Sequence, residues 1–353
     1  MFSAKYYKNK RSETADLLKG IAVLLMIQVH ITELFLQPHI YNSTFGKVSL
    51  FLGGPPAAPL FMAVMGYFLA FSKKNFSQGI LRGILLLAGG LLLNIGLNAN
   101  LLLKIYEGKL LLNPVQYIFG VDVLFLAGLS IILISILKPL FKKKLIYYLI
   151  LLPIPILVHA YLPTSEGGIM QYINAYFWGS YSWSYFPLFP WFSYVLLGFV
   201  FALILEKYRA VSEYRYNTLI AGAFAIILTA TFLFAMDISA ELEIYYHHDF
   251  TFFTWVSGFL FVLTFFVHKL EKYAGRVIIL KGIKFFGQNV TLAYVFQWLI
   301  IGNTATEVFK TFTLTEGIIA FFIVCLLTFL LIFIYLWIKE NYFEQRRLVT
   351  GDS

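Results

Sequence analysis

Residues 15–37 read ADLLKGIAVLLMIQVHITELFLQ, and this stretch decides the class of the protein. A helix of this length crosses a hydrocarbon core about 30 Å thick. The stretch nevertheless carries four ionisable side chains, Asp16, Lys19, His30 and Glu33. Because ionisable groups inside a bilayer are costly, they usually mark a functional site. The stretch therefore predicts a membrane helix that takes part in function.

The composition of the whole chain supports a membrane protein. Of the 353 residues, 60% are hydrophobic and 13% are charged, and the mean hydropathy is +0.78. A soluble domain has about 25% charged residues. Although the chain is long enough for two domains, its continuous hydrophobicity favours one membrane bundle.

Apolar runs recur along the sequence and predict an all-α, polytopic membrane helix bundle of about ten transmembrane helices. We place the spans at residues 15–37, 48–72, 79–103, 114–137, 145–161, 184–205, 217–236, 251–267, 286–303 and 315–338. One transmembrane domain, 15–338, is then flanked by a basic N-terminus, 1–14, and a tail, 339–353.

The basic residues predict the orientation of the bundle. Of the 27 lysines and arginines, 22 lie in the N-terminus, the even-numbered loops and the C-terminus, and four lie in the odd-numbered loops. By the positive-inside rule both termini are cytoplasmic. The net charge of +9 is spread between apolar runs, which favours contact with lipid headgroups and excludes a nucleic-acid partner. The Lys-, Phe- and Ile-rich usage suggests the cytoplasmic membrane of a bacterium.

Two residues of the first span share a face. Lys19 and His30 are eleven residues, or about 16 Å, apart along a helix, which is close to three turns. Glu33 lies one turn beyond His30, where a carboxylate could fix the imidazole tautomer. The alternative is a polar stripe that holds helices together.

The same residues carry a resemblance to a known superfamily. Asp16-Leu17-Leu18-Lys19-Gly20-Ile21-Ala22, followed by His30, resembles the first-helix motif of the transmembrane acyltransferases: a basic residue, ten residues, then histidine, with an acidic residue three before the basic one. Three further stretches are similar to the heparan-α-glucosaminide N-acetyltransferase-like branch, which is related to the acyltransferase-three membrane enzymes. They are 53–61 with Gly66, 186–191 with Gly198, and 287–297, where Gln297 stands at a position that is commonly histidine.

The resemblance implies a membrane-bound acetyltransferase that uses acetyl-CoA from the cytoplasm and an acceptor, most simply a sugar, on the other side. It implies that Lys19, together with Asp16 and Arg82, binds the acyl-CoA donor. His30 then acts as general base on the acceptor hydroxyl or amine, because an imidazole ordinarily titrates near working pH.

A second histidine competes for that role. His39 lies nine residues beyond His30 in the first outer loop, and the resemblance to the heparan-acetylating branch implies a catalytic histidine in a comparable loop. The alternative for His39 is a solvated loop residue. We favour His30 and keep both.

Candidate acceptor contacts lie further along the chain. Asp122 is a carboxylate within an apolar run and could pair with Lys19 or Arg82. Trp183 and Trp191 belong to an aromatic stretch that could stack on sugar rings, or that forms an interfacial aromatic belt.

Other features favour plain structural roles or leave alternatives open. The stretch His247-His248-Asp249 has no partners at ligand spacing and predicts a solvated loop, and we expect no metal. The helix-breaking stretch 53–59 could form a cavity wall. A transporter for a small polar or lipid-linked solute, using Lys19, Asp122 and His30 as its path, is the alternative function, and a structural envelope subunit is a third. The oligomeric state cannot be read from the sequence.

Overall fold

A computed structural model of the protein describes residues 12–208, 218–275 and 277–350, and these residues form helices joined by short connections. The predicted basic N-terminus, up to Arg11, lies outside them. Within the described residues no strand occurs, only two isolated bridges. The prediction of an all-α fold is confirmed.

Seven helical segments of the described residues are long and apolar enough to cross a membrane. They are α2 (Glu13–Leu34), α4 (Thr44–Gly53) with α5 (Ala58–Phe71), α6 (Phe76–Leu97), α9 (Val123–Phe141), α13 (Leu188–Lys207), α18 (Phe250–Ala274) and residues 314–342 of α21 (Leu314–Thr350). The pair α15 (Thr218–Ala230) and α16 (Phe232–Ala240), bent by 60°, makes an eighth if it is one span.

The remaining helices are shorter or more polar. They are α3 (Pro38–Tyr41), α7 (Ala99–Tyr106), α8 (Pro114–Ile118), α10 (Leu145–Leu151), α11 (Ile154–Val158), η1 (His159–Tyr161), α12 (Gly168–Phe177), α17 (Leu242–Tyr246), α19 (Ile278–Gln288) and α20 (Val290–Val308).

Besides the bent pair α15 and α16, two of the ten predicted spans differ from a simple crossing. The predicted span 145–161 is divided into α10, α11 and η1, because the region contains Pro153 and Pro155. The predicted span 286–303 corresponds to α20, which carries Gln297, Asn303 and Glu307 and is not among the apolar spans. The count of ten and the sides of the termini stay predictions.

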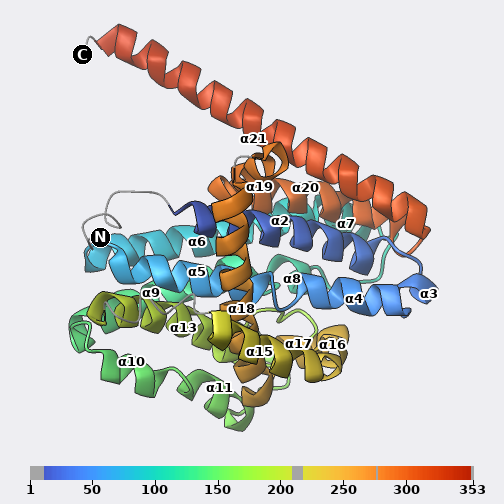
Figure 1. The fold of residues 1–353 in the computed structure, drawn as a ribbon. Helices are drawn as coiled ribbons and strands as arrows, with labels where there is room; N and C mark the ends of the chain where they lie inside the picture. The colour runs from blue at the N-terminus through green and yellow to red at the C-terminus, as the bar shows by residue number, and fades with distance from the viewer. Residues whose placement is uncertain (1–11, 209–217, 276, 351–353) are drawn as a thin grey trace.

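The helix α2 lies in the middle of the bundle, where it contacts α4, α5, α18, α19, α20 and α21. In Figure 1, α18 stands upright across the other helices, and α21 runs over the top and extends well past the bundle. Between residues 314 and 342, most side chains of α21 face outward, since only 22% of its most apolar stretch is buried. The functional side chains of α2 therefore point into a protein environment.

Two glycines allow α5 and α13 to approach closely. A Cβ at Gly198 of α13 would overlap the carbonyl oxygen of Ala63, and a Cβ at Gly66 of α5 would overlap that of Val195. Small residues at helix contacts are the usual device for close packing in membranes.

Replacing Gly198 by alanine is expected to destabilise the protein by about 3 kcal/mol, because the helices must separate to admit a methyl group. The melting temperature of the protein in detergent measures this. Gly222→Ala on α15 is the control: nothing lies within 4 Å of its Cβ position, so that variant should be as stable as wild type or slightly more stable. An equal melting temperature for Gly198→Ala and wild type would contradict the close contact.

Candidate functional site

The first turns of α2 hold an acidic and a basic side chain together. Ser12 caps the helix by accepting a hydrogen bond from the backbone N–H of Ala15. One turn on, Lys19 Nζ lies 2.9 Å from Asp16 Oδ1, and Asp16 is only 3% exposed. The ammonium group also lies 5.9 Å from the centre of the Phe68 ring. These contacts hold the Lys19 side chain in place.

A cavity of about 290 Å³ opens beside Lys19. Its wall comes from α2, α5, α6, α9 and α20, with Lys19 and the exposed Arg82 as its basic residues. The rest of its wall is largely apolar, including Phe61, Met65 and Phe68, with the polar Tyr294 and Thr291 of α20. The structure thus brings together the two basic residues that the sequence proposed for donor binding.

A second cavity of about 120 Å³ continues the basic character of the first. It shares Leu69, Ser72 and Arg82 with the larger cavity and adds Lys74 and Lys138. Lys138 Nζ donates to the carbonyl oxygens of Leu69 and Ser72 at 3.2 and 2.8 Å, which closes the end of α5. A polyanion that entered the larger cavity would meet basic side chains along its length.

Tyr294 connects the larger cavity to Asp122. Its hydroxyl donates to Asp122 Oδ2 at 3.1 Å, and Asp122 Oδ1 caps α9 by accepting from the Leu124 N–H at 2.8 Å. The sequence left open whether Asp122 pairs with Lys19 or Arg82. Among the ion pairs of the described residues, neither pairing occurs, so its polar partners are a phenol and a backbone amide.

His30 of α2 contacts Trp298, which lies one helical turn beyond Tyr294 on α20. Its ring packs on Trp298, with the two ring centres 4.0 Å apart and inclined by 33°. Nδ1 of His30 is buried and has no hydrogen-bond partner. Glu33 therefore does not hold the imidazole through Nδ1, in contrast to the role that the sequence suggested. Tyr294 and Trp298 are site residues that the sequence analysis did not single out, although their i, i+4 spacing puts them on one helix face.

Glu33 instead acts on two tyrosines near the C-terminal end of α2, Tyr41 and Tyr185. Burial first, then the charges of Glu33 and Glu241, raise the pKa of Tyr41 to about 12. Burial, followed by Tyr117 and Glu33, raises the pKa of Tyr185 to about 12 as well.

The connection between α20 and α21 lies against Glu33 and Tyr41. The backbone N–H groups of Lys310 and Phe312 donate to the carbonyl oxygens of Leu34 and Phe35 at 2.9 and 2.8 Å. Lys310 Nζ lies 3.7 Å from the centre of the Tyr41 ring. Burial lowers the pKa of Lys310, and Glu33 opposes this effect. The C-terminal end of α2 is thus joined to the connection between α20 and α21.

The other sequence-predicted residues lie apart from His30 in different ways. His39 is exposed on α3. Trp183 stacks on Tyr181 with the ring centres 5.0 Å apart, and its carbonyl oxygen accepts from the Val121 N–H, which places it beside Asp122. Trp191 is fully buried and donates from Nε1 to the Tyr246 carbonyl oxygen at 2.8 Å. In this structure Trp191 offers no surface to a ligand.

The prediction of a solvated loop at 247–249 is wrong for His248, although Asp249 is exposed. His248 is 1% exposed, its Nδ1 donates to the Tyr245 carbonyl oxygen at 2.8 Å, and its Nε2 accepts from the Tyr194 hydroxyl at 3.0 Å. The connection between α17 and α18 is folded into the bundle, where these partners replace water. Within the described residues no group of three or more His, Cys, Asp or Glu is arranged to hold a metal ion.

Burial lowers the pKa of His248 to about 3. An imidazole of the unfolded chain takes up a proton below about pH 6.5, whereas His248 in the folded protein stays neutral. Stability should therefore fall by about 1 kcal/mol per pH unit as the pH drops from 6.5 towards 4. Melting temperatures between pH 7 and 4.5 measure this slope. His248→Gln should reduce it, while His39→Gln at its exposed position should not; equal slopes for all three proteins would refute this prediction.

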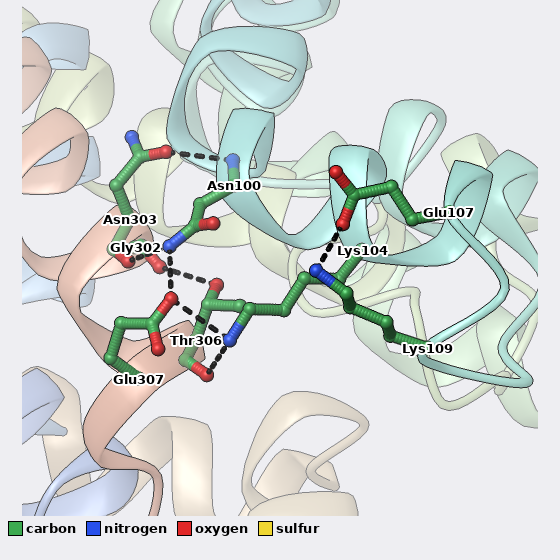
Figure 2. Close-up of polar contacts among 8 residues, drawn as sticks. All are labelled: Asn100, Lys104, Glu107, Lys109, Gly302, Asn303, Thr306 and Glu307. Carbon is green, nitrogen blue, oxygen red and sulfur yellow. Dashed lines mark hydrogen bonds and ion pairs between the residues drawn. The ribbon is translucent and has the colours of Figure 1, made fainter.

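A polar network fixes the position of α20 (Figure 2). Asn303 Oδ1 accepts from the Asn100 backbone N–H at 3.0 Å, and the Asn100 side chain donates to Glu307 Oε1 at 2.8 Å. Lys104 Nζ of α7 lies 2.8 Å from the same Glu307 oxygen. Asn303 also donates to the Gly96 carbonyl oxygen of α6 at 2.8 Å. These bonds hold α20 against α6 and α7 and so fix the position of Tyr294 and Trp298 relative to those helices.

Comparison with protein families places the chain in a known family. The model of the heparan-alpha-glucosaminide N-acetyltransferase catalytic family matches residues 11–222, more than half of the chain. No curated protein and no solved structure matches the chain. The matched residues contain Asp16, Lys19, His30 and Arg82, whereas α20 lies beyond them. The chain therefore belongs to the heparan-alpha-glucosaminide N-acetyltransferase catalytic family and is a membrane acetyltransferase.

Proposed function

We propose that the protein transfers an acetyl group from cytoplasmic acetyl-CoA to the amine or hydroxyl of an extracytoplasmic acceptor, most simply a sugar. The proposal places it in the bacterial cytoplasmic membrane with both termini inside. The observation that carries the proposal is the cavity between Lys19, Arg82 and Tyr294, because Tyr294 lies one helical turn before Trp298, which packs on His30.

The donor half follows from charge and shape. Lys19 and Arg82 suit the phosphates of CoA, since both cations pair well with phosphate oxygens. The largely apolar wall of the cavity suits the narrow pantetheine arm rather than the nucleotide. The thioester would then approach Tyr294 and His30 from the Lys19 end.

The acceptor half uses the outer end of α2. His30 takes the proton of the acceptor as its oxygen or nitrogen lone pair attacks the thioester carbonyl carbon. The carbonyl electron pair moves to oxygen and then returns as the C–S bond breaks, and the thiolate of CoA takes the proton from His30. Glu33 and its surrounding tyrosines, with Asp122 and Trp183, are the polar and aromatic groups available to orient the acceptor.

Purified protein reconstituted in liposomes tests the proposal. Acetyl-CoA is supplied on one side of the liposome membrane and a hexosamine or a neutral sugar on the other. Acetyl-CoA should be consumed, and the sugar acetylated on its amine or hydroxyl should be recovered. If the protein neither binds nor consumes acetyl-CoA, the donor assignment fails. If labelled solutes cross the liposome membrane without being acetylated, the alternative of a transporter replaces it.

A further inference from the structure

The side chain of Gln297 is a buried amide without a partner. The residue is 0% exposed, and neither Nε2 nor Oε1 has a hydrogen-bond partner. Buried polar groups in proteins are almost always hydrogen-bonded, because losing water without gaining a partner is unfavourable. A glutamine in this state has both its donor and its acceptor available to a ligand.

The position of Gln297 relates it to the proposed reaction. It lies on α20 between Tyr294, which lines the cavity, and Trp298, which packs on His30. Nδ1 of His30, on the helix α2 that packs against α20, is also buried without a partner. Two unsatisfied polar groups lie on packed helices, one of them a single turn beyond the cavity residue Tyr294, and this favours a ligand whose polar atoms reach them.

We propose that the amide N–H of Gln297 donates a hydrogen bond to the carbonyl oxygen of the acetyl group during transfer. This inference rests on the proposed acetyl transfer. When the acceptor attacks, the carbonyl electron pair moves to oxygen, and a donor already in place stabilises that negative charge. The amide returns unchanged when the C=O bond re-forms and the C–S bond breaks. His30 handles the proton, and Gln297 stabilises the oxygen.

A bond of this kind acts in the transition state more than in the bound substrate. Its loss should lower kcat and leave KM for acetyl-CoA nearly unchanged. Removal of one such donor typically lowers kcat about 100-fold or more. If the amide had no part in the reaction, its replacement by an apolar side chain would leave kcat unchanged. It would also leave stability unchanged or raise it, since replacing an unsatisfied buried polar group by an apolar one is neutral or stabilising.

The chain offers a matched control. Thr328 of α21 is also 0% exposed, and its hydroxyl oxygen has no hydrogen-bond partner. Gln297→Leu and Thr328→Val each remove an unsatisfied buried polar group. Both variants should keep the melting temperature of wild type or raise it. Only Gln297→Leu should lose kcat, by about 100-fold, with KM for acetyl-CoA within about two-fold of wild type.

Two further variants keep the test decisive if Gln297→Leu folds poorly. Gln297→His retains an N–H donor and should keep part of the activity, whereas Gln297→Glu retains the length but presents a carboxylate and should not. Wild-type kcat in Gln297→Leu, or equal activity in the histidine and glutamate variants, would show that the amide holds only structural water and overturn the inference. A wild-type protein that does not consume acetyl-CoA would remove the proposed function and this role with it.

Discussion

Replacing His30 by glutamine is expected to lower the rate of acetyl transfer about 1000-fold while leaving acetyl-CoA affinity within two-fold of wild type. A positioned general base contributes about 10²–10⁴ to a rate. Glutamine fills similar space against Trp298 but cannot take a proton at neutral pH. The larger cavity, which we propose holds the acetyl-CoA donor, is not lined by His30, so acetyl-CoA binding should persist. Single-turnover acetyl transfer and equilibrium binding of acetyl-CoA measure the two quantities.

His39→Gln is the matched control, because it makes the same change on the exposed face of α3. We expect it to transfer acetyl at the wild-type rate. Loss of transfer in His39→Gln, with transfer retained in His30→Gln, would assign the base to the loop histidine. If both variants retain transfer, neither His30 nor His39 is the base.

The sequence predicted what depends on local pattern. Long apolar runs predicted helices that the structure contains, and the three-residue spacing of Asp16 and Lys19 puts their side chains on one face, where they form an ion pair. Arg82 was expected near the same end of the bundle because basic residues gather on one side. The structure brings it to the cavity that also contains Lys19.

The missed contacts depend on how distant helices pack. Nothing in residues 286–303 shows which face of the helix meets His30, so Trp298 could be assigned as its neighbour only once α2 and α20 were seen together. Asp122 has Tyr294 as its partner for the same reason. His248 resembles a loop residue because histidine and aspartate flank it, yet Tyr194 and Tyr245 supply partners from α13 and α17.

Removing Lys19 and Arg82, the two cations of the larger cavity, should raise KM for acetyl-CoA strongly. We expect Arg82→Met and Lys19→Met each to raise it about ten-fold, and the double variant to raise it up to about 100-fold, with kcat largely retained. A cation that binds a remote phosphate interacts equally with substrate and transition state, so its loss appears in KM. Lys73→Met removes an exposed lysine that does not line the cavity, and it should leave KM unchanged.

A donor without phosphates separates charge recognition from a general disturbance of the site. S-acetyl-pantetheine carries the thioester and the arm but no phosphate, so wild type and the cavity variants should use it with equal KM. Lys19→Met also removes the cation beside the buried Asp16, and Asp16→Asn combined with it corrects for the carboxylate left behind. If the variants lose acetyl-pantetheine and acetyl-CoA to the same extent, the cations shape the cavity rather than bind phosphate. If only acetyl-CoA is affected, the phosphates of the donor lie at the Lys19 end and its thioester points along α20 towards His30.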